Sequence, residues 1–222
     1  MMLRLLDRLL IATIAIVLGS LSIAILAQTP DIAIIKSFLT PGTHLIDLNE
    51  YDSKTGKISA SRPAVLHLQL SAGSRDIAYA ETADLSGGHQ HVLTINVLRL
   101  DGTSYRKIFA RTYFDRVLFV QDCKTIGFQS IELPNGSAGL LIITSAGAAL
   151  GGDIELFSWK EGEGLINVVP PKVGGGYEFQ PLGGSSISTI KVSYRRSSIQ
   201  TNVPPATILT WNNASSSFVV SQ

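Results

Sequence analysis

The segment Leu66-His-Leu-Gln-Leu70-Ser-Ala-Gly-Ser-Arg-Asp-Ile77 decides the fold class of this chain. Its leucines recur at every second position, with His67 and Gln69 between them, so they share one face of an extended strand. A small polar turn follows, and the chain becomes apolar again at Ile77. Alternation with a period of two, closed by a turn, predicts two neighbouring strands.

The same pattern continues from Pro63 to the end of the chain. Short runs rich in β-branched and aromatic residues are bounded by Gly, Pro, Asn or Ser, and no long helical pattern follows residue 30. The chain also holds 20 Gly and 9 Pro, which is many for a helical protein. The expected strands are 65–70, 77–80, 92–100, 105–109, 116–120, 126–133, 140–145, 154–159, 165–169, 177–182, 187–194, 207–211 and 217–220. The sequence therefore predicts an all-β domain.

These strands recur as a group in a fixed order. Each group opens with an alternating strand that ends in Leu, continues through a small polar turn into a second apolar strand, and closes with a hairpin. The opening strands end at Leu70, Leu133 and Leu182, and the closing hairpins turn after Leu100, Trp159 and Trp211. A unit of about 50 to 60 residues with this order is a four-stranded antiparallel sheet, the size of one propeller blade.

The repeat divides the chain into expected segments. Residues 1–27 are an apolar export helix, and residues 28–62 are a linker or N-terminal strands, in which 32–38 fits either a strand or a short helix. Residues 63–222 form the repeated all-β domain. Its blade-like units are expected at about 63–120, 126–171 and 177–221.

The closing hairpins carry a family resemblance. Leu156-Phe-Ser-Trp159-Lys-Glu-Gly-Glu-Gly-Leu165 and Ile208-Leu-Thr-Trp211-Asn-Asn-Ala-Ser-Ser-Ser-Phe218 place an aromatic residue before a turn that contains Gly or Asn. With the openings, they resemble a degenerate FG-GAP or integrin-type (VCBS-like) β-propeller repeat over about residues 63 to 221. The resemblance implies antiparallel blades.

Three blades are fewer than the four or more of a closed propeller. The chain then forms a partial or open propeller, borrows strands from residues 32–62, or pairs with another copy. An open arc leaves strand edges exposed, and such edges invite partners.

In that family the turn after the first strand holds calcium through several Asp residues. The equivalent turns here are Ser71–Asp76, Pro134–Gly139 and Gly183–Ser186, and Asp76 is their one carboxylate. Calcium needs several oxygen ligands at a fixed spacing. We therefore expect no calcium in these turns and assign no cofactor to the chain.

The N-terminus predicts export. Arg4 and Arg8 precede an uncharged apolar run from Leu9 to Ala27, 19 residues long. Ala27 suits a signal-peptidase cut before Gln28. The run is also close to the about 20 residues that span a bilayer, so an uncleaved signal anchor is the alternative. Both place the following residues outside the cytoplasm.

Net charge and cysteine content limit the partners, the disulfides and the membrane anchors that we expect for this chain. The net charge is +1 and no basic stripe occurs, so nucleic acid is not an expected partner. Cys123 is the only cysteine, so the chain forms no internal disulfide. It also lies far from the apolar run, which excludes a lipoprotein acyl anchor. Membrane contact is expected only through residues 9–27, if they are not removed.

Four features of the sequence are candidate sites of chemistry. His89 and His91 share a face of an extended segment, but two His without a third ligand predict no metal. Cys123 lacks a Cys–His signature and is expected to be a loop thiol. Gly147–Gly152 lacks a phosphate-loop pattern and leads into a strand. Asp153 and Glu155 share one strand face and are candidates for a glycosidase pair, but they lie only about 7 Å apart along one strand, whereas carboxylates that flank a scissile bond usually come from two elements.

The expected function is binding rather than catalysis. No G-x-S-x-G or H-E-x-x-H pattern is present, and we assign no catalytic, cofactor-binding or metal residue. The chain is predicted to be an exported, non-enzymatic β-repeat protein that binds a protein or glycan partner at the cell envelope. The alternative is an extracytoplasmic hydrolase of a glycan or other polymer that uses Asp153, Glu155 or His67, two of which must then share a pocket.

Overall fold

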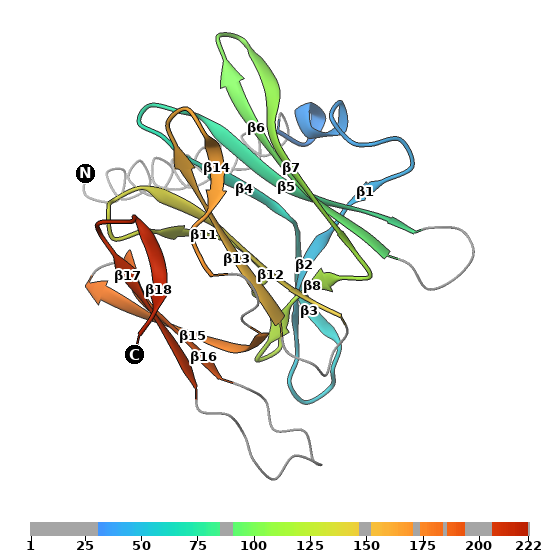
Figure 1. Ribbon diagram of the computed structural model, residues 1–222. Coiled ribbons are helices and arrows are strands. Elements are labelled where there is room, and N and C mark those ends of the chain that lie inside the picture. The colour runs from blue at the N-terminus through green and yellow to red at the C-terminus, as the bar shows by residue number, and fades with distance from the viewer. Residues whose placement is uncertain are drawn as a thin grey trace, which may run out of the picture. The chain divides into compact units, whose positions relative to one another are not determined.

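Figure 1 presents the computed structural model of the chain. The structure describes residues 31–84, 91–146, 152–170, 174–183, 186–193 and 206–221. The predicted export segment, residues 1–27, lies outside these residues and stays a prediction.

The chain divides into two compact units, residues Met1–Pro41 and Gly42–Gln222. Residues 31–36 of the first unit are helical, and Ser37 continues this turn by donating its N–H to Ile34 O at 3.0 Å. Of the two predictions for residues 32–38, the short helix is therefore the one that forms. Within the described residues, no helix is long and apolar enough to cross a membrane.

The second unit is built from strands, which confirms the prediction of a mostly antiparallel β fold (Figure 1). Its strands in the described residues are β1 (His44–Leu45), β2 (Asp47–Tyr51), β3 (Ile58–Pro63), β4 (Val65–Leu68), β5 (Asp76–Asp84), β6 (His91–Asp101), β7 (Ser104–Phe114), β8 (Val117–Leu118), β9 (Val120–Gln121), β10 (Lys124–Thr125), β11 (Phe128–Glu132), β12 (Ala138–Ser145), β13 (Gly152–Lys160), β14 (Gly164–Asn167), β15 (Gly174–Gly183), β16 (Ser186–Ser193), β17 (Thr207–Asn212) and β18 (Ser217–Val220).

These strands form three sheets. The five-stranded sheet has the order β4-β5-β6-β7, and β1 pairs with β5 beyond the end of β4. The small sheet has the order β3-β2-β10-β9, and every residue of its edge strand β3 is exposed. The large sheet contains nine strands, β8 and β11 to β18.

The large sheet joins what the repeat predicted as two separate units. Strands β11 to β14 pair in sequence, and so do β15 to β18. The two runs meet where Asp153 of β13 pairs with Gly174 of β15, and where Glu132 of β11 lies parallel to Ser186 of β16. Strand β13 has 9 residues and β14 only 4, so the first half of β13 has a free edge that β15 occupies.

The predicted strand 116–120 is wrong as a single element. Residues 117–118 pair with β12 of the large sheet, whereas residues 120–121 pair with β10 of the small sheet. Phe119 lies between them and donates its N–H to Ile143 O at 2.9 Å. The next predicted strand, 126–133, is also shorter and spans residues 128–132.

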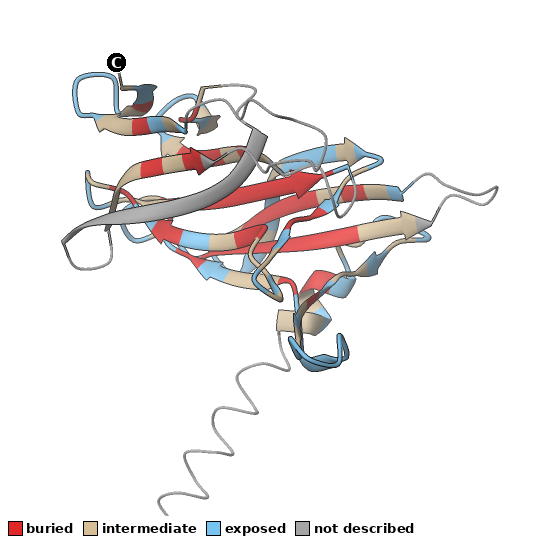
Figure 2. Ribbon diagram, turned by 90° about the horizontal axis from the view of Figure 1, so that it is seen from below, coloured by how far each residue is buried: buried red, intermediate tan, exposed pale blue. Residues whose placement is uncertain are grey.

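Strand β12 lies between two hydrophobic cores. Leu141 and Ile143 belong to one cluster, with β13, β16, β17 and β18, and Leu140 and Ile142 belong to the other, with β4, β5 and β6. Figure 2 shows this burial as red that continues along the central strands. A strand buried on both faces reads as a continuous apolar run, which explains why the sequence does not alternate here.

Candidate functional site

A cluster of charged residues and one tyrosine connects β7 with β13. Asp153 and Glu155 lie two residues apart on β13 and share a face of the strand, as do Arg111 and Tyr113 on β7. Arg111 Nη2 donates to Glu155 Oε1 at 2.8 Å, and the Tyr113 hydroxyl donates to Glu155 Oε2. Arg116 Nη1 lies 2.9 Å from Asp153 Oδ2. We call these five residues the β7–β13 cluster.

Burial governs the electrostatics of this cluster. Burial raises the pKa of Tyr113 above its usual value, and the hydrogen bond and negative charge of Glu155 raise it further. Burial is the largest single influence on the pKa of Arg111 and lowers it, but Glu155 and Tyr113 together outweigh burial and leave the pKa raised. Tyr113 therefore stays a neutral donor and Arg111 a cation at any physiological pH. Together they hold Glu155, whose side chain is 18% exposed.

The cluster surrounds a hollow of about 310 Å³. Asp153 and Glu155 both line it, so the geometric condition set for the hydrolase alternative is met by this pair. His67 does not line it; this residue is exposed on β4 and makes its own interaction elsewhere. Each carboxylate of the pair lies against an arginine. The bonds of Arg111 and Tyr113 to Glu155 form a bridge between the five-stranded and large sheets.

Loss of the Tyr113 hydroxyl tests this bridge. We expect Tyr113→Phe to lower the free energy of unfolding by about 1.5 to 3 kcal/mol, because a half-buried carboxylate loses a charge-assisted donor. Urea denaturation followed by circular dichroism measures the change. Tyr105→Phe is the matched control on the same strand, since the Tyr105 hydroxyl has no partner among the described residues. Equal losses in the two variants would contradict the bridge.

Asp76 occupies the position at which the resemblance places calcium ligands. Its side chain is fully buried and pairs with Arg99, whose Nε lies 2.7 Å from Asp76 Oδ1. Asp76 Oδ2 also accepts from Leu70 N at 3.0 Å and from Ser74 Oγ. The Arg99 guanidinium lies 3.9 Å from the centre of the Trp159 ring. The Asp76 carboxylate therefore joins the turn between β4 and β5 to strand β6.

Other predicted candidates are spread over the fold. His89 lies outside the described residues, and His91 begins β6, is exposed and makes its own interaction. Cys123 is a half-buried free thiol in the β9–β10 turn, with a φ of 64°. Of Gly147–Gly152, only Gly152 is described, and it pairs with Gly175. Within the described residues, no three His, Cys, Asp or Glu side chains are grouped to hold a metal ion.

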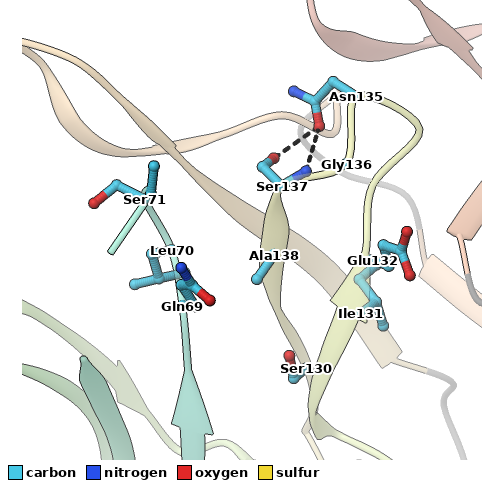
Figure 3. Close-up of a pocket in the computed structure, with 11 residues that line it drawn as sticks. Gln69, Leu70, Ser71, Ser130, Ile131, Glu132, Asn135, Gly136, Ser137 and Ala138 are labelled. Carbon is cyan, nitrogen blue, oxygen red and sulfur yellow. Dashed lines mark hydrogen bonds between the residues drawn. The ribbon is translucent and has the colours of Figure 1, made fainter. Parts of the chain in front are cut away.

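A second hollow lies between the turn that follows β4 and the β11–β12 turn. It has a volume of about 650 Å³. Figure 3 shows the end of β4 and its turn on one side, and β11 with the β11–β12 turn on the other. Its polar lining residues are Gln69, Ser71, Ser130, Glu132, Asn135 and Ser137. The sequence predicts that both turns occupy equivalent positions of a repeat, but no pattern in it indicates that they face each other.

No protein-family model matches the chain, and a search of curated proteins finds no significant match. The FG-GAP-like resemblance therefore remains a hypothesis.

Proposed function

We propose that this chain is an exported, non-enzymatic β-repeat protein that acts as a binding or assembly module at the cell envelope or outside the cell. One observation carries the proposal: the two carboxylates that the sequence offers for catalysis, Asp153 and Glu155, are each paired with an arginine, and the Arg111–Glu155 pair joins two sheets. A catalytic carboxylate must reach a substrate atom within hydrogen-bond distance, whereas these serve the fold. The exposed polar hollow and the exposed edge of β3 are left as surfaces for partners.

We also propose that the strands form three blade-like units of a partial propeller. Its support is the strand order, since β4–β7, β11–β14 and β15–β18 are each four consecutive strands that pair antiparallel. The units depart from separate blades where β13 pairs with β15. A degenerate FG-GAP-like origin is part of this proposal and rests on the repeat alone.

The proposed location rests on Arg4, Arg8 and the apolar run from Leu9 to Ala27. A mature chain that begins at Gln28 would show a cleaved signal peptide and release. An intact Met1 would show an anchor through residues 9–27. In either case, protease added outside intact cells, or outside spheroplasts, should digest the β domain. Full protection, with a cytoplasmic protein digested only after lysis, would contradict export.

Cross-linking in the native envelope tests the binding function. A cell-impermeant cross-linker followed by affinity purification under denaturing conditions should capture a defined protein or glycan partner. The control is an unrelated exported β protein expressed at the same level. Recovery of the uncross-linked chain alone, with both reagents working on a known complex, would count against a binding module.

The alternative is a hydrolase of a glycan or other polymer. It is favoured by one observation, that Asp153 and Glu155 share the 310 Å³ hollow. Release of new reducing ends from polysaccharides, lost in both Asp153→Asn and Glu155→Gln while the variants stay folded, would support it. Unchanged release in these variants would exclude the pair.

A further inference from the structure

Strand β7 lies beside β6 at the end of the five-stranded sheet (Figure 1), and the backbone of its second half has a free edge among the described residues. Asp115 N donates to His91 O at 2.9 Å, so this N–H is directed toward β6. The Phe114 C=O lies on the opposite side of the same trans peptide and is directed away from β6. Because main-chain groups alternate in direction along a strand, the N–H and C=O groups of Ala110, Thr112 and Phe114 are all directed away from β6.

This free edge lacks the usual protection against pairing. Edge strands are commonly blunted by charged residues, by proline or by a bulge. The register shift of β7 lies before the stretch Ala110–Phe114, which contains no proline. Its one charged residue, Arg111, is paired with Glu155. Ala110, Arg111, Thr112 and Phe114 are exposed, and Phe114 is 69% exposed. Another strand can therefore reach both the backbone groups and an apolar side chain.

The edge of β3 offers less to a second strand, although every residue of β3 is exposed. A register shift opposite Glu50 and Tyr51 interrupts its pairing with β2. Pro63, at its end, has no N–H to donate. Strand β7 therefore has the longer uninterrupted edge of the two.

The stretch Ala110–Phe114 is complementary to itself. When two copies pair antiparallel about a twofold axis at Thr112, the two Thr112 residues lie opposite each other. Phe114 of each copy then lies opposite Ala110 of the other, with Thr112 as its diagonal neighbour. Thr–Thr pairs and pairs of an aromatic with a β-branched residue stabilise neighbouring strands. This face of the paired strands is therefore favourable across the axis.

Charge favours the same register. Arg111 of each copy lies opposite Tyr113 of the other, on the second face of the paired strands. Within one chain the Arg111 guanidinium already lies 5.7 Å from the centre of the Tyr113 ring. An axis at Arg111 would instead place arginine opposite arginine, and like charges directly opposite each other destabilise a strand pair. The axis at Thr112 avoids this repulsion.

We propose that the chain pairs with a second copy of itself through Ala110–Phe114 of β7. This pairing forms about six main-chain hydrogen bonds and covers Phe114 in both copies. It uses the same surface of each copy, so it closes as a dimer. A contact of this small size predicts a weak, concentration-dependent dimer. The pairing rests on the proposed assembly function and names its partner.

Association of the full chain with rising concentration tests the pairing. Sedimentation equilibrium, in density-matched detergent if the apolar run is retained, should show monomer and dimer in equilibrium. Hydrogen exchange followed by NMR locates the contact, because the amides of Ala110, Thr112 and Phe114 should exchange more slowly as the concentration rises. The Tyr105 amide is the internal control. It is also directed away from β6, since Leu100 opposite it donates its N–H to Arg75 O on the other side, but it lies beyond the paired stretch.

Two variants and a matched control separate backbone pairing from other association. Thr112→Pro removes an N–H that makes no bond to β6, so an edge strand can accept it. It should weaken dimerisation by about tenfold or more. Thr112→Val loses the same contact to the Thr94 hydroxyl, 3.2 Å away, but keeps the N–H, and should dimerise as the unmodified chain does. Phe114→Ser leaves the backbone unchanged and should weaken the dimer by about tenfold through lost apolar burial. Circular dichroism checks folding, and Phe114→Ser decides if Thr112→Pro does not fold.

Three results would overturn the pairing. These are a chain that stays monomeric up to its solubility limit, equal dimer dissociation constants in Phe114→Ser, Thr112→Pro and Thr112→Val, or exchange at the three outward amides that does not depend on concentration. The proposed function has separate outcomes. A monomeric chain that envelope cross-linking joins to a different molecule keeps the binding function without the self-pairing. A dimer through β7 with no cross-linked copy or partner in the envelope keeps the self-pairing without the envelope function.

Discussion

Replacement of Asp76 by Asn should lower the free energy of unfolding by about 3 to 5 kcal/mol. The Asp76 side chain is fully buried and Arg99 is 13% exposed, so the variant leaves a buried guanidinium without its counter-charge. Asn keeps an oxygen that can still accept from Leu70 N, so the loss reports mainly the charge. Urea denaturation with far-ultraviolet circular dichroism measures it.

The hairpin of β6 and β7, to which Arg99 also belongs, provides the control. Arg106 and Asp101 form a second Arg–Asp pair at 3.3 Å, but their side chains are 60% and 70% exposed. Asp101→Asn should cost less than about 1 kcal/mol, because water screens an exposed pair. Adding Arg99→Met to Asp76→Asn should recover part of the loss, since the uncompensated charge is then removed. Similar losses in Asp76→Asn and Asp101→Asn would contradict a buried charge pair.

The sequence predicts strands well where one face is buried. In β4, Leu68 lies in the core and His67 is exposed, so burial alternates with the residues. Strand β12 is apolar without alternation because its two faces contact different cores. Each pattern reports the local environment of a single strand, which is why strand positions follow from the sequence.

Contacts between distant strands leave no such pattern. Arg111 and Glu155 are 44 positions apart, and neither residue type indicates its partner. The sequence places Asp153 and Glu155 on one face of a strand, but it does not identify the arginines that pair with them. The pairing of β13 with β15 is also missed, because it depends on β14 ending early rather than on any residue of β15. Which distant strands pair therefore depends on where neighbouring strands end, and the pattern of a single strand does not show this.

Gly127→Ala should be among the most damaging single substitutions in the described part of the chain. A Cβ at position 127 would lie 2.3 Å from Ile143 O and 2.5 Å from Phe119 N. Both neighbours are backbone atoms, so no side chain can rotate away. Ile143 N also donates to Gly127 O at 3.0 Å, and Gly127 N donates to Phe119 O at 3.1 Å. Three backbone segments meet here, and relieving the clash must break these bonds.

The expected loss is about 3 kcal/mol, at the upper end for overpacking. Thermal and urea unfolding of the two proteins measure it, and hydrogen exchange at Ile143 and Phe119 should rise more than elsewhere. Gly136→Ala is the control. Gly136 has a φ of 78° and open space around its added Cβ, so Ala there costs about 1 to 2 kcal/mol of backbone strain without a clash. If Gly127→Ala were tolerated better than Gly136→Ala, the close approach of the three backbones would be wrong. A larger loss in Gly127→Ala than in Gly136→Ala would show that β12, the strand between both cores, depends on the close approach of backbones that Gly127 permits.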